Sequence, residues 1–174
     1  VKVKVMDASE LYDPEFRKLS KAKGVTIIIP VGSLEQHGAH LPITTDSDIV
    51  TEVASRLAKK CGFIVFPTIS YGYSVEHIPL FNASVGKINL SEMLLSIIST
   101  TAATSNHPKS IIVLNGHHGN KDTVGKIERI FANPKLRISK NRKKEELMHL
   151  LTTGVKVKSY SYWNFMKHEF DHAG

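Results

Sequence analysis

Residues 25–60 read VTIIIPVGSLEQHGAHLPITTDSDIVTEVASRLAKK, and they carry the clearest fold signal in the chain. The first seven, VTIIIPV, form a short apolar run rich in β-branched residues, which is typical of a strand buried on both faces. Residues 46–60 place apolar side chains at helical spacing, and Gly62 follows just past the expected helix end. A buried strand followed by a helix is the repeating unit of a parallel sheet.

The same alternation continues through the rest of the chain. Further strands are predicted at residues 63–69, 110–114 and 155–162, and further helices at residues 90–104, 121–131 and 144–153. Strands that alternate with helices of this length predict right-handed crossovers and a mostly parallel central sheet in a three-layer α/β/α fold. A length of 174 residues with 41% hydrophobic side chains fits a single domain over residues 1–174.

Composition argues against several classes of protein. No apolar run approaches the roughly 20 residues of a membrane-spanning helix, and the N-terminus has no apolar stretch suited to a signal peptide. Cys61 is the only cysteine, which favours a reducing compartment. A cytoplasmic protein without membrane contact is therefore the expectation.

The formal charge of +7 raises the question of an anionic partner. The densest basic cluster, residues 140–144, is followed at once by Glu145 and Glu146, as expected for the solvated start of a helix. An electropositive rim for a phosphorylated metabolite is the second interpretation. Nucleic-acid binding is not expected, because the sequence contains no recognisable module for it.

Two loops concentrate the side chains that carry chemistry, and each follows a predicted strand. Loops at the carboxyl ends of parallel strands line the functional crevice of such sheets. Imidazole and carboxylate groups are the ligands that Zn, Mn and Fe prefer, so the two loops together predict a metal site. The candidate residues are Glu35, His37, His40, Asp46 and Asp48 in the first loop, and His117 and His118 in the second.

Purely structural roles are the alternative to metal binding for these residues. A single histidine more often caps a helix or fills a polar pocket, and Asp46 at a helix start is suited to be an N-cap. Clustering in two loops favours ligation, since a carboxylate at the sheet edge can bridge two ions about 3.5–4 Å apart. The segment VGSLEQ lacks the G-x-S-x-G pattern of serine hydrolases, and neither H-E-x-x-H nor a phosphate-cradling glycine loop occurs.

Four motifs together resemble the creatininase family of amidohydrolases. They are GSLEQHGAHLPITTD at residues 32–46, SYGYSVEH at residues 70–77, NGHHGN at residues 115–120 and HAG at residues 172–174. The resemblance spans nearly the whole chain. It implies a three-layer α/β fold, often assembled into hexamers, that uses two divalent ions (Zn, Mn or Fe) to hydrolyse a C–N bond of a small-molecule amide, cyclic amide or formamide.

The resemblance also implies roles for individual residues. Glu35 and His117 would bind one ion, His37 the other, and Asp46 would bridge the two. His172 would be the catalytic acid and base. The side chains expected at the substrate are His118 and Trp163, although a buried aromatic core role is the alternative for Trp163.

The sequence departs from the family pattern at three places. Gly119 stands where some members carry a glutamate ligand of the second ion, and the chain stops at Gly174, where the family continues, so a C-terminal part is expected to be missing. Residues 76–84 read EHIPLFNAS, where the family usually has the sequence Phe-Pro-Gly-Thr after Glu-His. The resemblance leaves two alternatives to a general amidohydrolase: a deformylase of a formamidopyrimidine nucleotide in riboflavin and deazaflavin biosynthesis, favoured slightly by the basic composition, and an inactive metal-binding or assembly subunit.

Overall fold

The computed structural model describes residues 6–103, 108–133 and 154–166. Its sheet has five parallel strands in the order β1-β3-β2-β4-β5. The strands are β1 (Met6–Asp7), β2 (Thr26–Val31), β3 (Ile64–Val65), β4 (Ser110–Asn115) and β5 (Lys156–Ser161). The α-helices are α1 (Asp13–Lys23), α2 (Thr45–Cys61), α3 (Lys87–Ala103) and α4 (Lys121–Ala132). Short 3-10 turns occur at Ala8–Glu10, Val75–His77, His118–Asn120 and Tyr162–Phe165.

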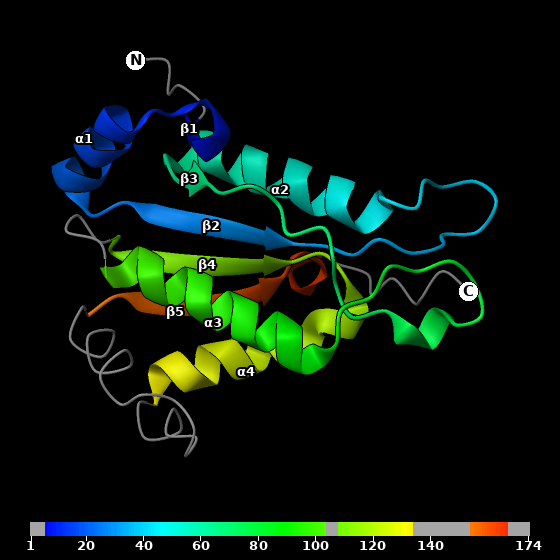
Figure 1. Cartoon of the computed structure of the whole chain (residues 1–174). Helices are drawn as coiled ribbons and strands as arrows, with labels where there is room; N and C mark the ends of the chain where they lie inside the picture. Colours follow the sequence, from blue (N-terminus) through cyan, green and yellow to red (C-terminus); the bar gives the residue numbers. More distant parts are fainter. Residues whose placement is uncertain (1–5, 104–107, 134–153, 167–174) are drawn as a thin grey trace.

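Helices cover both faces of the sheet, as Figure 1 shows. On one face, α3 and α4 pack against β2 and β4 through a core that includes Leu94, Ile98 and Ile127, all fully buried, and α1 packs against the same core. On the other face, α2 packs through Val50 and its neighbours against a second apolar cluster. The three-layer α/β/α fold with a parallel sheet, predicted from the sequence, is therefore confirmed.

The predicted elements lie close to the observed ones, with one clear correction. The strand expected over residues 63–69 is hydrogen-bonded as a strand only at Ile64–Val65. Proline lacks a backbone N–H, so Pro67 cannot continue the ladder; Ile69 returns to the sheet edge as an isolated bridge to Val31. The helix predicted from residue 90 begins earlier, at Lys87, and the helix predicted at residues 144–153 lies outside the described residues.

The N-terminal helix α1 was not predicted from apolar periodicity. Its boundaries do carry recognisable signals, because Pro14 lies at the helix start and Gly24 ends the helix in a left-handed conformation. Among the described helices, none has both the length and the apolar character that crossing a bilayer would require.

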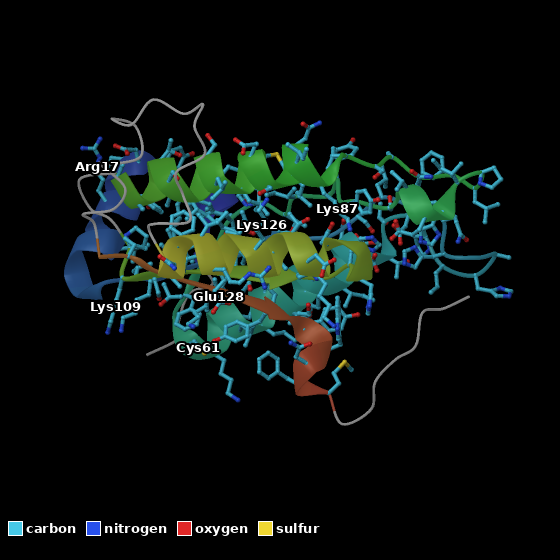
Figure 2. The ribbon with its side chains drawn as sticks, turned by 90° about the horizontal axis from the view of Figure 1, so that it is seen from below. Arg17, Cys61, Lys87, Lys109, Lys126 and Glu128 are labelled. Atoms are coloured by element: carbon cyan, nitrogen blue, oxygen red, sulfur yellow. The ribbon has the colours of Figure 1, made fainter. Side chains whose placement is uncertain are left out.

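Strand β5 at the sheet edge is tied to α4 by Glu128, which is labelled in Figure 2. The Glu128 carboxylate accepts hydrogen bonds from Lys158 Nζ at 2.8 Å, from the Ser159 N–H at 2.8 Å and from Ser159 Oγ at 2.9 Å. Partial burial acts to raise the pKa of Glu128, but these hydrogen bonds outweigh it and hold the pKa below its ordinary value.

Candidate metal centre

The loops that carry the candidate ligands leave the sheet at the carboxyl ends of its two central strands. Residues 32–44 follow β2, and residues 116–120 follow β4; both strand ends point to the same side of the molecule in Figure 1. The chain leaves β2 toward β3 on one side and leaves β4 toward β5 on the other, so these two loops diverge at a topological switch point. A third loop, residues 66–86, follows β3 and reaches the same edge.

The four side chains predicted to be ligands lie together at this edge. Glu35, His37 and Asp46 each offer a ligand atom, and these atoms lie within 4.8 Å of one another. His117 Nδ1 lies 2.8 Å from Asp46 Oδ2 and 3.3 Å from Glu35 Oε1. Both Glu35 and His117 are 3% exposed, so the cluster is built into the protein and is not a chance group of surface charges.

Asp46 occupies the first turn of α2, where the positive end of the helix dipole favours a carboxylate. The alternative role as an N-cap is wrong, because the helix begins at Thr45 with Thr44 in the cap position. Asp46 Oδ2 accepts a hydrogen bond from Ser33 Oγ at 2.7 Å. The two oxygens of Asp46 face different histidines, Oδ1 lying 3.2 Å from His37 Nε2 and Oδ2 facing His117.

The His117 ring is fixed from its other side. Its Nε2 lies 2.8 Å from the Tyr73 carbonyl oxygen, which can only accept, so Nε2–H is the donor and Nδ1 faces the carboxylates. Gly119 permits this contact: a Cβ at that position would collide with the Tyr73 carbonyl oxygen and lie 2.6 Å from His117 Nε2. In this conformation position 119 has no room for the glutamate ligand that the family resemblance led us to consider there.

Electrostatics at the cluster favour a cation. Burial raises the pKa of Glu35, and the neighbouring Asp46 charge adds to that effect against the pull of the histidines. Burial acts to raise the pKa of Asp46 as well, but hydrogen bonds from His117 and Ser33 outweigh it and lower the pKa. Burial opposes the charged form of His117, yet its contacts with Asp46 and Glu35 raise its pKa. Two carboxylates therefore share a nearly dry site that is stabilised by positive charge.

The residues present fit a divalent cation. The donor set consists of two carboxylates and two imidazoles, the combination found at hydrolytic zinc, manganese and iron sites. Glu35 Oε2 is buried and has no hydrogen-bond partner within the described part of the chain. An unpaired buried carboxylate oxygen is costly, and a metal ion would satisfy it.

A cavity of about 460 Å³ lies over the cluster. Its walls include both predicted substrate-contacting residues, His118 and Trp163, whose rings stack with centroids 5.7 Å apart and an interplanar angle of 12°. Trp163 is half-buried and faces this cavity, so it is not part of the apolar core. His172, the predicted acid and base, lies outside the described residues, and His40 and Asp48 are exposed.

Three residues at the site were not predicted from the sequence. His77 and Tyr73 belong to the loop after β3, and Gln36 belongs to the loop after β2 and contacts His77. His77 Nε2 lies 3.2 Å from Glu35 Oε1, and Gln36 Nε2 lies 2.9 Å from His77 Nδ1. Tyr73 contributes through its backbone oxygen. The usable signal was the position of residues 70–77 after a strand of the same parallel sheet, which by the strand-end rule makes this a third loop at the site.

The family model described as creatininase, creatinine amidohydrolase, matches residues 9–174. This chain belongs to the creatininase family. A solved mutant creatininase of the Zn–Zn type superimposes with a TM-score of 0.77 at 27% identity, covering 95% of this chain and 61% of that one.

Two relatives show how varied the reactions of similar proteins are. The mycofactocin precursor peptide peptidase of Mycolicibacterium smegmatis is 34% identical over 104 residues, covering 56% of this chain and 41% of that protein. The 2-amino-5-formylamino-6-ribosylaminopyrimidin-4(3H)-one 5'-monophosphate deformylase of Methanosphaera stadtmanae is 32% identical over 123 residues, covering 64% and 48%. The creatininase-family chain described here thus spans less than two thirds of the length of each of these proteins.

Proposed function

We propose that this chain is a metal-dependent amidohydrolase that cleaves a C–N bond of an amide, cyclic amide or formamide. The observation that carries the proposal is the buried cluster of Glu35, His37, Asp46 and His117 at the switch point, with one Glu35 oxygen unpaired. Its place in a family of hydrolases that act on amide C–N bonds supports the same reaction class.

Two divalent ions would be held, one by Glu35 and His117 and the other by His37, with Asp46 between them. The opposed contacts of the two Asp46 oxygens support this division. Such ions supply a water that is acidic near neutral pH and polarise a carbonyl oxygen. We assign Zn, Mn or Fe as the candidates, because the donors are nitrogen and oxygen.

The remaining residues would bind the substrate and move a proton. The stacked rings of His118 and Trp163 give the cavity a flat aromatic wall, which suits a planar amide group. Low exposure of Glu35 and His117 keeps bulk water from competing for the charged groups. His172 would deliver a proton to the departing nitrogen, a task suited to a side chain that titrates near neutral pH.

Two alternatives remain distinct. The relative that deformylates a pyrimidine 5'-monophosphate favours a phosphorylated formamide as the specific substrate. The second alternative is an inactive metal-binding or assembly subunit, motivated by Gly119 in place of a glutamate.

The proposal is tested with Asp46→Ala, paired with Asp48→Ala as a matched control. Both residues lie in the first turn of α2, but Asp48 is exposed. The unsubstituted chain and Asp48→Ala are expected to bind zinc or manganese, quantified by elemental analysis after dialysis, and to hydrolyse one substrate among creatinine, the formamidopyrimidine nucleotide and a model peptide. Asp46→Ala is expected to lose both properties. Metal binding without turnover of any substrate would instead support the inactive subunit, and equal metal content in all three proteins would reject the site.

A further inference from the structure

We propose that Gln36 and His77 are positioning residues of the metal centre. They form a relay in which hydrogen bonds link the Gly38 N–H to Gln36 and Gln36 to His77. The relay fixes the tautomer of His77, whose ring contacts Glu35 Oε1, and leaves Glu35 Oε2 as the ligand atom. The relay rests on the proposed metal function for its purpose, but its geometry can be measured without any metal.

The first link fixes the orientation of the Gln36 amide. Gly38 adopts a left-handed backbone conformation with φ 69°, and this turn directs its N–H to Gln36 Oε1 at 2.9 Å. A backbone N–H can only donate, so the amide oxygen must face it. The amide nitrogen of Gln36 is therefore at the opposite end, where it lies 2.9 Å from His77 Nδ1.

The second link fixes the tautomer of His77. An amide NH₂ can only donate, so His77 Nδ1 must accept with its lone pair. A neutral imidazole with a lone pair on Nδ1 carries its proton on Nε2. His77 Nε2 lies 3.2 Å from Glu35 Oε1, so the relay ends with this N–H next to the carboxylate.

The consequence falls on the two oxygens of Glu35. Oε1 faces His77 Nε2 at 3.2 Å and His117 Nδ1 at 3.3 Å, whereas Oε2 is buried with no partner among the described residues. The Glu35 side chain is only 4% exposed, so water cannot readily replace a missing donor. The His77 ring beside one oxygen orients the carboxylate so that the other oxygen can meet a cation, as outer contacts do at other metal sites.

The relay also connects the loop that follows β2 to the loop that follows β3. Gln36 and His77 are 41 residues apart, on the loops that follow β2 and β3. The backbone reinforces this contact, because the Gln36 N–H donates to the Phe81 carbonyl oxygen at 2.8 Å. The backbone contact holds the two loops side by side, and the side-chain contact then places the Gln36 amide against the His77 ring.

A pair of His77 variants separates this positioning role from simple packing. The amide nitrogen of Gln can reach the place of Nε2, whereas that of Asn reaches only the place of Nδ1. His77→Gln is expected to retain the zinc affinity of the unsubstituted chain within a few-fold, and His77→Asn to lose about 10–100-fold. Affinity is measured on the full chain by competition with a chromogenic chelator, with His40→Gln, on the exposed part of the same turn region, as a control expected to match the unsubstituted protein.

The tautomer itself is read by ¹⁵N NMR of histidine-labelled, metal-free protein, with the His77 signals assigned by their absence in His77→Gln. We expect His77 to be protonated on Nε2 in the unsubstituted chain. In Gln36→Glu an acceptor replaces the donor opposite Nδ1, and we expect the proton to move to Nδ1. Urea unfolding of each variant checks that the fold is retained.

Three results would overturn the relay: a His77 proton on Nδ1 in the unsubstituted chain, an unchanged tautomer in folded Gln36→Glu, or equal zinc affinities of the Gln and Asn variants of His77. Failure of the proposed function looks different. A chain that binds no zinc at all would refute the metal centre, whereas the tautomer measurement would still decide whether the relay exists.

Discussion

Asn120 joins the three loops of the candidate metal centre, and replacing it with alanine is the sharpest test of how they are held. The side chain is fully buried. Its Oδ1 accepts a hydrogen bond from the Tyr73 N–H at 2.9 Å, and its Nδ2 donates to the Gly32 carbonyl oxygen at 2.9 Å. Asn120 itself ends the turn after β4, so one amide connects the segments that follow β2, β3 and β4.

The cost of Asn120→Ala follows from these two contacts. Each hydrogen bond contributes about 1 kcal/mol net, and a buried group left without its partner costs about 1–3 kcal/mol. We therefore expect a loss of about 2–4 kcal/mol in the free energy of unfolding, a large part of the 5–15 kcal/mol typical of a domain. Asn120→Asp keeps the contact with the Tyr73 N–H but places a buried carboxylate oxygen against the Gly32 carbonyl oxygen, so its loss should be at least as large as that of Asn120→Ala.

Urea unfolding followed by circular dichroism measures the effect, with Asn82→Ala as the control. Asn82 makes a local, exposed hydrogen bond to the Leu80 carbonyl oxygen, and its removal should cost about 0.5 kcal/mol or less. Zinc affinity should fall with Asn120→Ala as well, because the Tyr73 carbonyl that orients His117 loses its anchor. Equal stabilities of the two alanine variants would refute the idea that Asn120 holds the loops.

Three further predictions concern packing and pH. Glu128→Gln should destabilise the chain at about pH 7, and the difference in stability from the unsubstituted protein should shrink at about pH 3. The reason is that folding lowers the pKa of Glu128. The contribution of its carboxylate to stability is therefore complete above the ordinary pKa of 4.5 and is lost as the pH falls through the lower pKa of the folded state. A constant difference in urea midpoints across this range would contradict it. Gly119→Ala should cost about 1–3 kcal/mol and weaken zinc binding, since the new methyl group meets the Tyr73 carbonyl oxygen; unchanged zinc affinity would show that this loop yields freely. Leu94→Ala, in the middle of α3 and fully buried, should cost about 2–5 kcal/mol in urea, and a loss below about 1 kcal/mol would contradict the core packing.

Much of the fold was predictable because buried strands appear in the sequence as short apolar runs, and helices as apolar residues at helical spacing. Helix α2 was predicted at residues 46–60 and is found at Thr45–Cys61, since its apolar face and the glycine beyond its end are both local signals. The early start of α3 was missed because Ile88, in its first turn, is 77% exposed and gives no buried-face signal. The shortened β3 came from Pro67, whose effect on the ladder outweighed the apolar run around it.

The candidate site also has a part that could be predicted from the sequence and a part that could not. Glu35, His37, Asp46 and His117 follow or adjoin strands of one parallel sheet, so their convergence could be expected from topology alone. The contribution of Tyr73 could not, because it is made by a backbone oxygen that any residue would supply. The other missed contacts join loops 41 residues apart, and no short-range period records where such a loop will fold.

The strand order also indicates where substrate selectivity resides. Divergence of the loops after β2 and β4 opens the crevice, and the loop after β3 closes it from one side because β3 lies next to β2. That third loop supplies His77 to the cavity, and its segment of residues 76–84 is also where this chain departs from the family wording. The candidate metal ligands come from the two central loops and the start of α2, within the segments that resemble the family motifs. Changes of substrate among family members should therefore be sought first in the side chains of residues 76–84 other than His77, because His77 contacts Glu35 and the backbone of this segment is paired with residues 34–36.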